Sequence, residues 1–392
     1  MGHTASDDAS TLDELRRRLE PALAGEAVLD LTEESGGRTV ALPDGTAVVL
    51  ATSGSTSGTG HRVALSADAL LASARATHAR LGGPGTWILA LDPRHVAGLQ
   101  VLVRGIVAGS SPVVAAASPF DPHALAAAAD AVPGDGPLYT SLVPTQLVRA
   151  LAAGRDVVDP LRRLDAILLG GAAAPSDLLA RAADAGLRVV TTYGMTETCG
   201  GCVYDGVPLD GVDVAVDAAG RISIGGPTLA LGYVGGDDAA AATRSSFSDG
   251  RFRTSDRGEY ADGVLRVLGR VDDVVVTGGV NVDPHVVEDA LAGDDAVGHV
   301  AVVGVPDPEW GAVLVACVVP ARGPAATGPA ATGPDAAELL ASLRRRAAAA
   351  LSPAHAPRHV VVLDVLPERG PGKVDRRALA ALAAARLAEG RR

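Results

Sequence analysis

The chain has 392 residues, of which 47% are hydrophobic and 20% are charged, and its formal net charge is −12. This composition is typical of a globular protein with two or three domains, and the negative charge argues against a broad nucleic-acid interface, which requires clustered cations. No apolar run reaches the ~20 residues of a membrane span, and the acidic start lacks the basic segment of a secretion signal. We therefore expect a soluble cytoplasmic protein.

A tract rich in glycine and hydroxyl residues follows a predicted buried strand at 47–50. The tract ends at His61 and Arg62, and the apolar run 63–65 predicts a short return strand before a helix near Ser66. Backbone N–H and side-chain O–H groups at this density can surround a polyphosphate, although a plain surface turn has the same composition. No Gly-Lys-Ser or Gly-Lys-Thr triplet follows, so the tract is not the common P-loop. The candidate phosphate-binding residues are Thr52, Ser53, Gly54, Ser55, Thr56, Ser57 and Gly58.

Short apolar runs alternate with helical stretches between residues 86 and 194. Because the runs are apolar at successive positions, we expect strands covered on both faces and hence a mainly parallel α/β sheet. Ligands of such sheets bind at the carboxyl ends of the strands, where Gly170-Gly171 and Tyr193-Gly194 fall. The strands are expected at 87–91, 112–117, 138–143, 166–169 and 189–192.

The tract from Tyr193 to Glu197 has side chains that suit a nucleotide. A tyrosine can stack on a purine, the Thr196 hydroxyl can bind a phosphate, and the Glu197 carboxylate can hold Mg²⁺. A surface turn is the alternative interpretation of the same five residues.

Cys199 and Cys202 form a C-x-x-C pair in a glycine-rich turn. A zinc site needs more ligands, but Cys317 is remote and no histidine follows the pair at finger spacing. We interpret both as small residues of the turn, with a metal or redox role as the less favoured alternative.

Closely spaced strand-like pieces predict a β-rich subdomain at about 205–268, and a compact α+β pattern follows at 274–392. The expected fold class is therefore α/β, with a large N-terminal domain over 1–268, in which helices cover mainly parallel sheets, and a small C-terminal α+β domain. A Gly, Pro and Ala repeat at 323–334 cannot bury a core and predicts a mobile surface loop.

Three charged residues beyond position 250 complete the candidate site. Asp256 can accept hydrogen bonds from both hydroxyls of a ribose, and Arg270 can donate to them, although solvated hairpin charges explain the same pattern. Lys373 lies in a flexible Gly/Pro context near the C-terminus, where most lysines are surface cations.

Four tracts, at 52–62, 193–197, 253–273 and 370–377, together and in this order resemble the adenylate-forming superfamily of acyl- and aryl-CoA ligases, adenylation domains and luciferases. The resemblance covers residues 48–379, but the phosphate loop begins earlier in the chain than is usual, which suggests a short form that lacks part of the N-terminal subdomain. Tracts 94–104, 141–147 and 168–173 are most similar to the branch that ligates o-succinylbenzoate to CoA in menaquinone biosynthesis.

The resemblance implies an AMP-forming acid:CoA ligase that works in two half-reactions. The acid first attacks Mg-ATP to give an acyl-adenylate and pyrophosphate, and the thiol of CoA then displaces AMP. The expected ligands are ATP, Mg²⁺, CoA and o-succinylbenzoate or a related aromatic keto acid. Lys373 matches the catalytic lysine of the first step, Thr196 is expected at the phosphates, and Glu197 matches the Mg²⁺ ligand. The remaining residues expected at ATP or AMP are Gly170, Gly171, Ala172, Tyr193, Gly194, Asp256 and Arg270.

The resemblance also implies that the small domain is mobile. Lys373 must withdraw before CoA reaches the same carbonyl carbon, so a hinge at 269–273 with its pivot at Asp272 is expected to rotate the small domain. Gly278 and Gly279 would then line the CoA channel. A rigid turn between domains is the alternative.

The ring carboxylate of o-succinylbenzoate is not activated and needs an anchor in an apolar pocket. Arg104 is the first candidate and Ser141 a second donor, although a snorkelling surface arginine is the competing account of Arg104. His95 is expected to close the pocket near the ketone or the thiol, or else to be a packed loop histidine. Gly194 and Thr198 would line the rest of the pocket.

One departure from the superfamily pattern lies at the end of the phosphate loop. Relatives usually have a lysine where this chain has His61 and Arg62, so Arg62 would keep the charge with a different donor geometry. The alternatives to the o-succinylbenzoate ligase are another aryl- or acyl-acid:CoA ligase, a catalytically silent nucleotide-binding relative and a carrier-protein loading domain. The sequence leaves the oligomeric state open, with a homodimer among the options.

Overall fold

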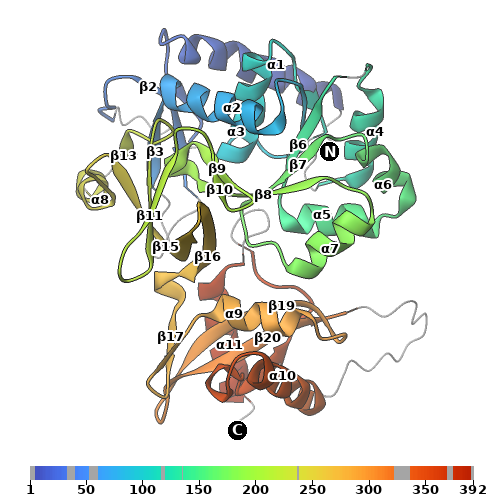
Figure 1. Cartoon of the computed structure of the whole chain (residues 1–392), viewed down its shortest axis with the longest axis vertical. Coiled ribbons are helices and arrows are strands. Elements are labelled where there is room, and N and C mark those ends of the chain that lie inside the picture. Colours follow the sequence, from blue (N-terminus) through green and yellow to red (C-terminus); the bar gives the residue numbers. More distant parts are fainter. Residues whose placement is uncertain are drawn as a thin grey trace. The chain divides into compact units, whose positions relative to one another are not determined.

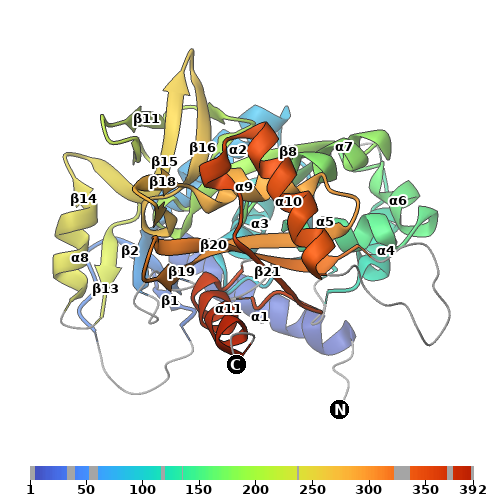
Figure 2. The ribbon, with the colours of Figure 1, turned by 90° about the horizontal axis from the view of Figure 1, so that it is seen from below.

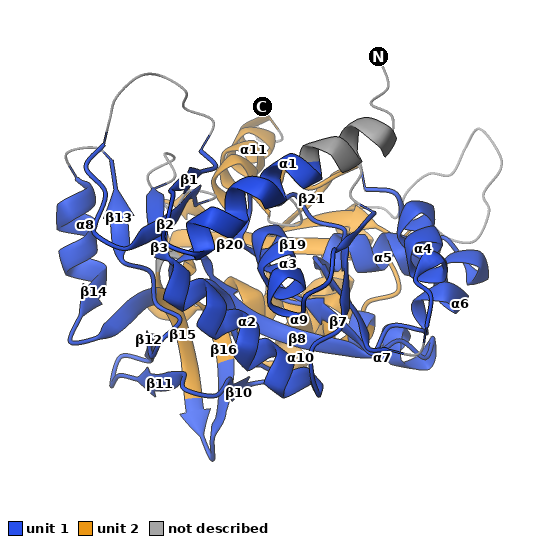
Figure 3. Ribbon diagram, turned by 90° about the horizontal axis from the view of Figure 1, so that it is seen from above, with its two compact units in different colours: residues 1–174, 178–254, 260–266 blue, residues 175–177, 255–259, 267–392 orange. Residues whose placement is uncertain are grey.

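The computed structural model describes residues 5–32, 40–52, 61–115, 120–134, 136–235, 238–321, 336–368 and 374–389. The chain divides into two compact units, which Figure 3 colours separately and which are described one at a time below. The first contains residues 1–174, 178–254 and 260–266, and the second contains 175–177, 255–259 and 267–392. No helix within the described ranges is long and apolar enough to cross a membrane.

A seven-stranded sheet forms the centre of the first unit (Figure 1). Its strand order is β10-β9-β8-β7-β6-β4-β5, and the pairs from β5 to β8 are parallel, whereas β9 and β10 are antiparallel to their neighbours. The mainly parallel sheet is therefore confirmed. The strands are β4 (Thr86–Leu89), β5 (Val113–Val114), β6 (Leu138–Leu142), β7 (Ala166–Leu169), β8 (Val189–Met195), β9 (Gly200–Tyr204) and β10 (Val207–Pro208).

Helices cover both faces of this sheet, as the unbroken apolar runs predict. Successive side chains of a strand point to opposite faces, so Trp87 packs in one core cluster while its neighbour Ile88 packs in the other. The Trp87 cluster includes residues of α1 (Ala5–Leu23), α2 (Ala67–Leu81) and α3 (Val96–Val107). The Ile88 cluster includes residues of α4 (Pro122–Ala131), α5 (Pro144–Ala152), α6 (Arg155–Leu161) and α7 (Ser176–Asp184).

A four-stranded sheet lies in the first unit, and a five-stranded sheet contains residues of both units, because 255–259 and 267–270 belong to the second. In the four-stranded sheet, β2 and β3 form an antiparallel pair, with β1 parallel to β2 and β13 antiparallel to β3. Helix α2 begins directly after β3, where the Ser66 hydroxyl accepts a hydrogen bond from the amide of Ala69. The four strands are β1 (Leu29–Asp30), β2 (Thr46–Ala51), β3 (Arg62–Ser66) and β13 (Gly232–Val234).

The predicted β-rich region contains the five-stranded sheet β11-β12-β15-β14, with β16 paired to β15. Helix α8 (Ala239–Ser246) and the short 3-10 turn η1 (Thr196–Thr198) flank the sheets of this unit. The strands are β11 (Asp213–Val216), β12 (Arg221–Gly225), β14 (Phe247–Ser248), β15 (Arg251–Ala261) and β16 (Val264–Arg270).

A three-stranded sheet forms the core of the second unit (Figure 2). Strand β20 (Gly311–Pro320) lies between antiparallel β19 (Val297–Asp307) and parallel β21 (His359–Val362). Helices α9 (Pro284–Ala292) and α10 (Ala336–Ala350) cover one face, and α11 (Arg376–Glu389) covers the other. The unit also contains η2 (Val271–Asp273), η3 (Pro353–His355) and the hairpin β17 (Val275–Thr277) with β18 (Val280–Val282). The Gly, Pro and Ala repeat lies outside the described residues.

Candidate active site

The two described ends of the phosphate tract are joined by hydrogen bonds. The amide of Thr52 donates to the carbonyl oxygen of His61 at 2.8 Å, and the amide of His61 donates to the Thr52 hydroxyl at 2.9 Å. Because β2 and β3 pair as far as Ala51 and Arg62, the predicted strand, loop, strand arrangement is confirmed. Ser53 to Gly58 lie outside the described residues, and their phosphate contacts stay a prediction.

Arg62, the proposed substitute for the usual loop lysine, forms an ion pair with Asp30 of β1. Its side chain is 19% exposed, and its Nε atom is buried without a hydrogen-bond partner in the described structure. Asp30 reaches this position because β1 pairs in parallel with β2, which lies beside β3. The charge of Arg62 is thus balanced within the protein, which the sequence did not indicate.

Close backbone packing explains two of the predicted site glycines. A Cβ atom at Gly194 would overlap the carbonyl oxygen of Gly200 on β9, and one at Gly170 would overlap the hydroxyl of Thr192 on β8. Gly171 has φ +83°, which L side chains rarely adopt. These glycines therefore let the ends of β7, β8 and β9 approach one another at the carboxyl edge of the parallel strands.

The turn after β8 carries the half-buried Glu197 and, next to it, Thr198. Thr198 is fully buried, and its hydroxyl donates to the carbonyl of Gly200 at 2.8 Å and accepts from the amide of Met195 at 3.0 Å. Thr198 was predicted to line the acid pocket, but in the structure its hydroxyl is already used in hydrogen bonds that close the turn.

Tyr233 of β13 connects the turn to the phosphate tract. Its hydroxyl donates to Oε1 of Glu197 at 2.9 Å, and its ring centroid lies 4.7 Å from that of His61. Burial, together with the adjacent Glu197 carboxylate, raises the pKa of Tyr233, so the hydroxyl stays a donor. No sequence motif pointed to Tyr233, because only the pairing of β13 with β3 brings it to this position.

The donor chemistry of Glu197 fits Mg²⁺ that arrives with ATP. Such an ion takes most of its oxygen ligands from phosphates and water and needs only one or two protein carboxylates. Glu197 supplies one such carboxylate, and its partner Tyr233 contacts His61 at the described end of the phosphate tract.

Residues of α2 and α3 form hydrogen bonds with Cys199, at the C-terminal end of the same turn. The carbonyl oxygen of Cys199 accepts from Nε2 of Gln100 on α3 at 2.9 Å and from the hydroxyl of Ser73 on α2 at 3.1 Å. All three residues are fully buried, and Cys199 has φ 52°, an uncommon value for a residue other than glycine. Gln100 and Ser73 therefore fix the position of the turn that carries Glu197.

Burial also decides the chemistry of the three cysteines. It raises the pKa of Cys199, and it raises the pKa of both Cys202 and Cys317 to about 12. All three thiols are free and buried, so their reactive thiolate forms are disfavoured.

Arg104 lies in the last turn of α3 and is only 3% exposed. Its Nη2 atom donates to the Tyr204 hydroxyl at 3.3 Å, its guanidinium carbon lies 4.8 Å from the Trp87 ring centroid, and its Nε atom has no partner in the described structure. Burial lowers the pKa of Arg104, and no carboxylate among the described residues pairs with it. The snorkelling account of Arg104 is therefore wrong, because the guanidinium does not reach the surface.

Ser141 and His95 are two further candidates for the acid site. Ser141 is buried on β6 and, by strand alternation, points to the same face of the sheet as Tyr139, which is the face that α3 covers. His95 is the exposed N-cap residue of α3. Within the described ranges, no hydrogen bond joins Arg104 to either residue.

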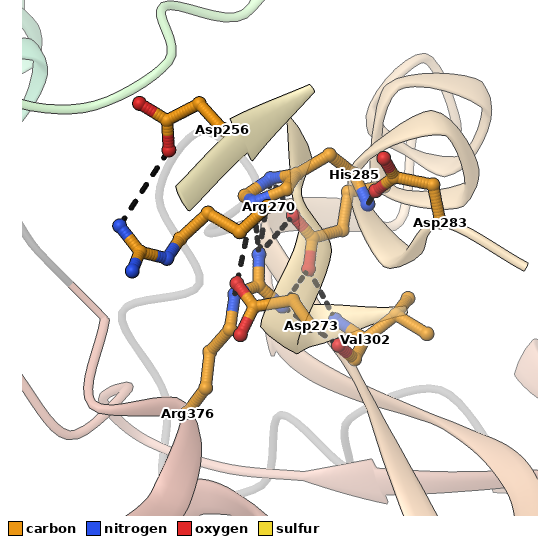
Figure 4. Close-up of polar contacts among 8 residues, drawn as sticks. Asp256, Arg270, Asp273, Asp283, His285, Val302 and Arg376 are labelled. Atoms are coloured by element: carbon orange, nitrogen blue, oxygen red, sulfur yellow. Dashed lines mark hydrogen bonds and ion pairs between the residues drawn. The ribbon is translucent and has the colours of Figure 1, made fainter. Parts of the chain in front are cut away.

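Ala172 follows β7, Tyr193 lies in β8 and Thr196 begins η1, all in the first unit, and the other described candidates lie in the second unit. Asp256 and Arg270 form an ion pair at 3.5 Å (Figure 4), so the two predicted ribose ligands do lie together. The Gly278 amide donates to the carbonyl of Trp310 at 3.0 Å, and a Cβ atom at Gly278 would lie 2.8 Å from the Trp310 ring. Gly279 has φ +80°, so both glycines are required by the turn between β17 and β18. Asp272 lies in η2, and Lys373 lies outside the described residues.

Comparison with known families identifies this architecture. The profile of the AMP-binding enzyme family matches residues 5–234, more than half of the chain, and that of the AMP-binding enzyme C-terminal domain matches residues 286–373. The chain belongs to the AMP-binding enzyme family. The resemblance inferred from the four sequence tracts is thereby confirmed.

Two curated relatives share much of the sequence. A protein of Mycobacterium tuberculosis named probable 2-succinylbenzoate-CoA ligase is 47% identical over 349 residues, which are 86% of this chain and 85% of the relative. A feruloyl-CoA synthase of an Amycolatopsis species is 35% identical over 280 residues, 66% of this chain and 53% of the relative. The AMP-binding family thus includes similar proteins named for two different aromatic acids.

Two solved structures of similar proteins carry ligands. The o-succinylbenzoate CoA synthetase of Bacillus subtilis, in complex with the acyl-adenylate intermediate, matches with a TM-score of 0.70 and 27% identity over 85% of this chain and 69% of the other. ATP-bound MatB of Rhodopseudomonas palustris matches with a TM-score of 0.73 and 27% identity over 86% of this chain and 68% of the other. The fold class is therefore the one shared by these AMP-binding enzymes.

Proposed function

We propose that this protein is an ATP-dependent ligase that activates o-succinylbenzoate as an acyl-adenylate and transfers it to CoA, with release of AMP and pyrophosphate, in menaquinone biosynthesis. The observation that carries the proposal is the 47% identity, over 86% of the chain, to the mycobacterial protein named for this activity. The structural match to the B. subtilis synthetase with its acyl-adenylate supports the same chemistry.

The first half-reaction brings two anions together, so cations at the reacting oxygens should stabilise its transition state most. In our proposal, Lys373 bridges the acid carboxylate and the α-phosphate, Glu197 holds Mg²⁺, and residues 52–58 hold the outgoing phosphates. Bound Mg²⁺ would neutralise charge on the phosphate oxygens. Tyr233 orients the Glu197 carboxylate through its hydroxyl.

The nucleoside and the second half-reaction involve the other proposed residues. Residues 170–172, Tyr193 and Gly194 would contact the adenine, and Asp256 with Arg270 would bind the ribose. After adenylation the small domain would rotate about Asp272, so that Lys373 withdraws and the Gly278-Gly279 turn lines the path of CoA. Thr196 is proposed beside the phosphates and His95 at the entrance to the acid pocket.

The burial of Arg104 supports a carboxylate as its ligand. A cation removed from water costs several kcal/mol unless an anion and further hydrogen bonds compensate, and Arg104 has one neutral hydrogen bond, one aromatic contact and an unpaired Nε. The ring carboxylate of o-succinylbenzoate would supply the missing anion. Ser141, on the sheet face that α3 covers, is the proposed additional donor.

The test is pyrophosphate release by the purified protein with MgATP and a panel of acids, each with and without CoA. We expect release with o-succinylbenzoate and an acyl-CoA product when CoA is present. If no aromatic keto acid supports ATP-dependent release, the proposal is wrong.

The similarity to the feruloyl-CoA synthase favours a second candidate, a ligase for a hydroxycinnamic acid. Such an acid has no second carboxylate for Arg104. Ferulate therefore belongs in the same panel, and a higher kcat/KM for ferulate than for o-succinylbenzoate would select the second candidate.

A further inference from the structure

Two carboxylates, Glu288 and Asp273, and the imidazole of His285 meet around Arg376, the first residue of α11 (Figure 4). Arg376 contacts both carboxylate oxygens of Glu288 on α9, each at 2.8 Å, and donates to the carbonyl of Val302 on β19 at 2.8 Å. Its Nε atom lies 3.4 Å from Oδ2 of Asp273, and the ring of His285 lies 3.1 Å from Glu288. We call this set the Arg376 cluster.

The polar side chains of the Arg376 cluster are paired with one another. The Arg376 and Glu288 side chains are 19% and 14% exposed, and the amide of Val302 also donates to Glu288 at 2.5 Å. Burial by itself would raise the pKa of Glu288, but His285 and Arg376 outweigh it and lower that pKa. A bidentate arginine–carboxylate contact of this kind fixes the orientation of the guanidinium as well as its distance from the carboxylate.

The cluster joins segments that the proposed reaction uses separately. Asp273 directly follows the proposed pivot Asp272, and Arg376 stands three positions after Lys373 in the sequence. The described residues between Lys373 and Arg376 are also held, because Val374 pairs with Glu368 and the amide of Asp375 donates to the carbonyl of Pro367 at 2.8 Å.

Retention of α11 on the sheet does not depend on this cluster. Leu379 and Ala383, one and two turns farther along the helix, are fully buried against the apolar face of β19 and β20. Burial of such side chains supplies the stability of the helix contact, whereas the Arg376 cluster fixes where its first turn begins.

We propose that Glu288 and Arg376 are positioning residues for the adenylation step, which hold the chain just after Lys373 at a fixed place relative to α9, β19 and Asp273. The proposal rests on the proposed function, and in particular on the role of Lys373. A displacement of about 1 Å can lower the rate of such a step by about 100-fold. The thioester step, which does not use Lys373, should not depend on this contact.

The experiment compares Arg376→Lys with the neighbouring Arg377→Gln, since Arg377 is exposed. Both half-reactions are measured on each protein: pyrophosphate release from MgATP and o-succinylbenzoate, and acyl-CoA formation from supplied acyl-adenylate. Arg376→Lys keeps the charge but loses the bidentate contact with Glu288. We therefore expect the rate of adenylation to fall by about 10- to 100-fold, while the rate of thioester formation stays within about 2-fold of the wild-type rate. Glu288→Gln should show the same split, and Arg377→Gln should show neither effect.

Hydrogen exchange of the same full-length proteins gives a readout that is independent of activity. Amides in the first turn of α11 should exchange faster in Arg376→Lys, with those around Ala383, one turn farther along, unchanged. An equal loss of both half-reactions, or unchanged adenylation, would overturn the positioning role while leaving the proposed function intact. Wild-type protein that releases no pyrophosphate with any acid would instead overturn the proposed function, and the inference with it.

Discussion

Replacement of Arg104 by methionine separates what this residue does for substrate binding from what it costs in folding. The guanidinium has one hydrogen bond at 3.3 Å and lies 4.8 Å from the Trp87 ring centroid, but no described carboxylate pairs with it. These contacts stabilise the folded state by about 1 to 3 kcal/mol, whereas burial of an uncompensated charge destabilises it by several kcal/mol. Methionine has a flexible side chain that can fill the space against Trp87. We therefore expect Arg104→Met, without substrate, to be as stable as the wild type or more stable by about 1 to 3 kcal/mol.

The same substitution should weaken binding of the dicarboxylate. A hydrogen bond to a charged group is worth about 1.5 to 3 kcal/mol, so loss of the anchor should raise KM for o-succinylbenzoate by roughly 10- to 150-fold. An aromatic monocarboxylic acid that the enzyme accepts serves as the matched substrate, and its KM should change by less than about 3-fold. The carboxylate anchored by Arg104 is not the one that reacts, so kcat should change less than KM.

Denaturant unfolding and steady-state pyrophosphate release measure the two effects on one preparation. A destabilisation of more than about 2 kcal/mol would mean that Tyr204 and Trp87 already compensate the charge, which would make Arg104 a structural residue. An equal rise in KM for both acids would reject the anchor, because the loss would not depend on the second carboxylate.

Three further predictions concern single residues. Lys373→Ala should abolish adenylate formation and spare acyl-CoA formation from supplied acyl-adenylate; equal loss of both steps would contradict the two-position scheme. Gly194→Ala should destabilise the fold by about 2 kcal/mol or more in denaturant unfolding, because its Cβ atom would overlap backbone, whereas Gly136→Ala, where nothing lies within 4 Å, should change stability by less than about 0.5 kcal/mol. Burial, with the Arg104 charge nearby, lowers the pKa of His78 from 6.5 to about 4. The unfolded chain therefore binds more protons between these values, and the free energy of unfolding should fall by up to about 3 kcal/mol as the pH drops from 6.5 to 4; a His78→Gln variant that keeps this full slope would refute the assignment.

The sequence by itself determined the fold class and the family. Unbroken apolar runs such as 166–169 indicate strands that are buried on both faces. Because this pattern lies within a few consecutive residues, the mainly parallel sheet and its covering helices could be predicted from the sequence. The order of the four tracts along the chain was sufficient for the family, which the matches over residues 5–234 and 286–373 confirm. The placement of Gly170 directly after β7 followed from the same runs. Tyr193 and Gly194, which were expected just past a strand at 189–192, lie within β8 instead, because pairing with β9 extends that strand to Met195.

The tertiary structure alone decided which side chains touch. Tyr233 reaches Glu197 because β13 pairs with β3, and Arg62 meets Asp30 because β1 lies beside β2. The sequence allowed Arg104 to be either a pocket residue or a surface residue, and the structure shows it buried beside Trp87 and Tyr204.

The contact between Glu288 and Arg376 joins positions far apart in the sequence, and no sequence motif predicts that the two residues pair. Hydrogen bonds and ion pairs require agreement within a few tenths of an ångström, and that precision arises only when strands and helices from distant segments are packed together. Periodicity and motif order carry no information at that scale, which is why the sequence predicted the family and the candidate residues while the packed structure decided their partners.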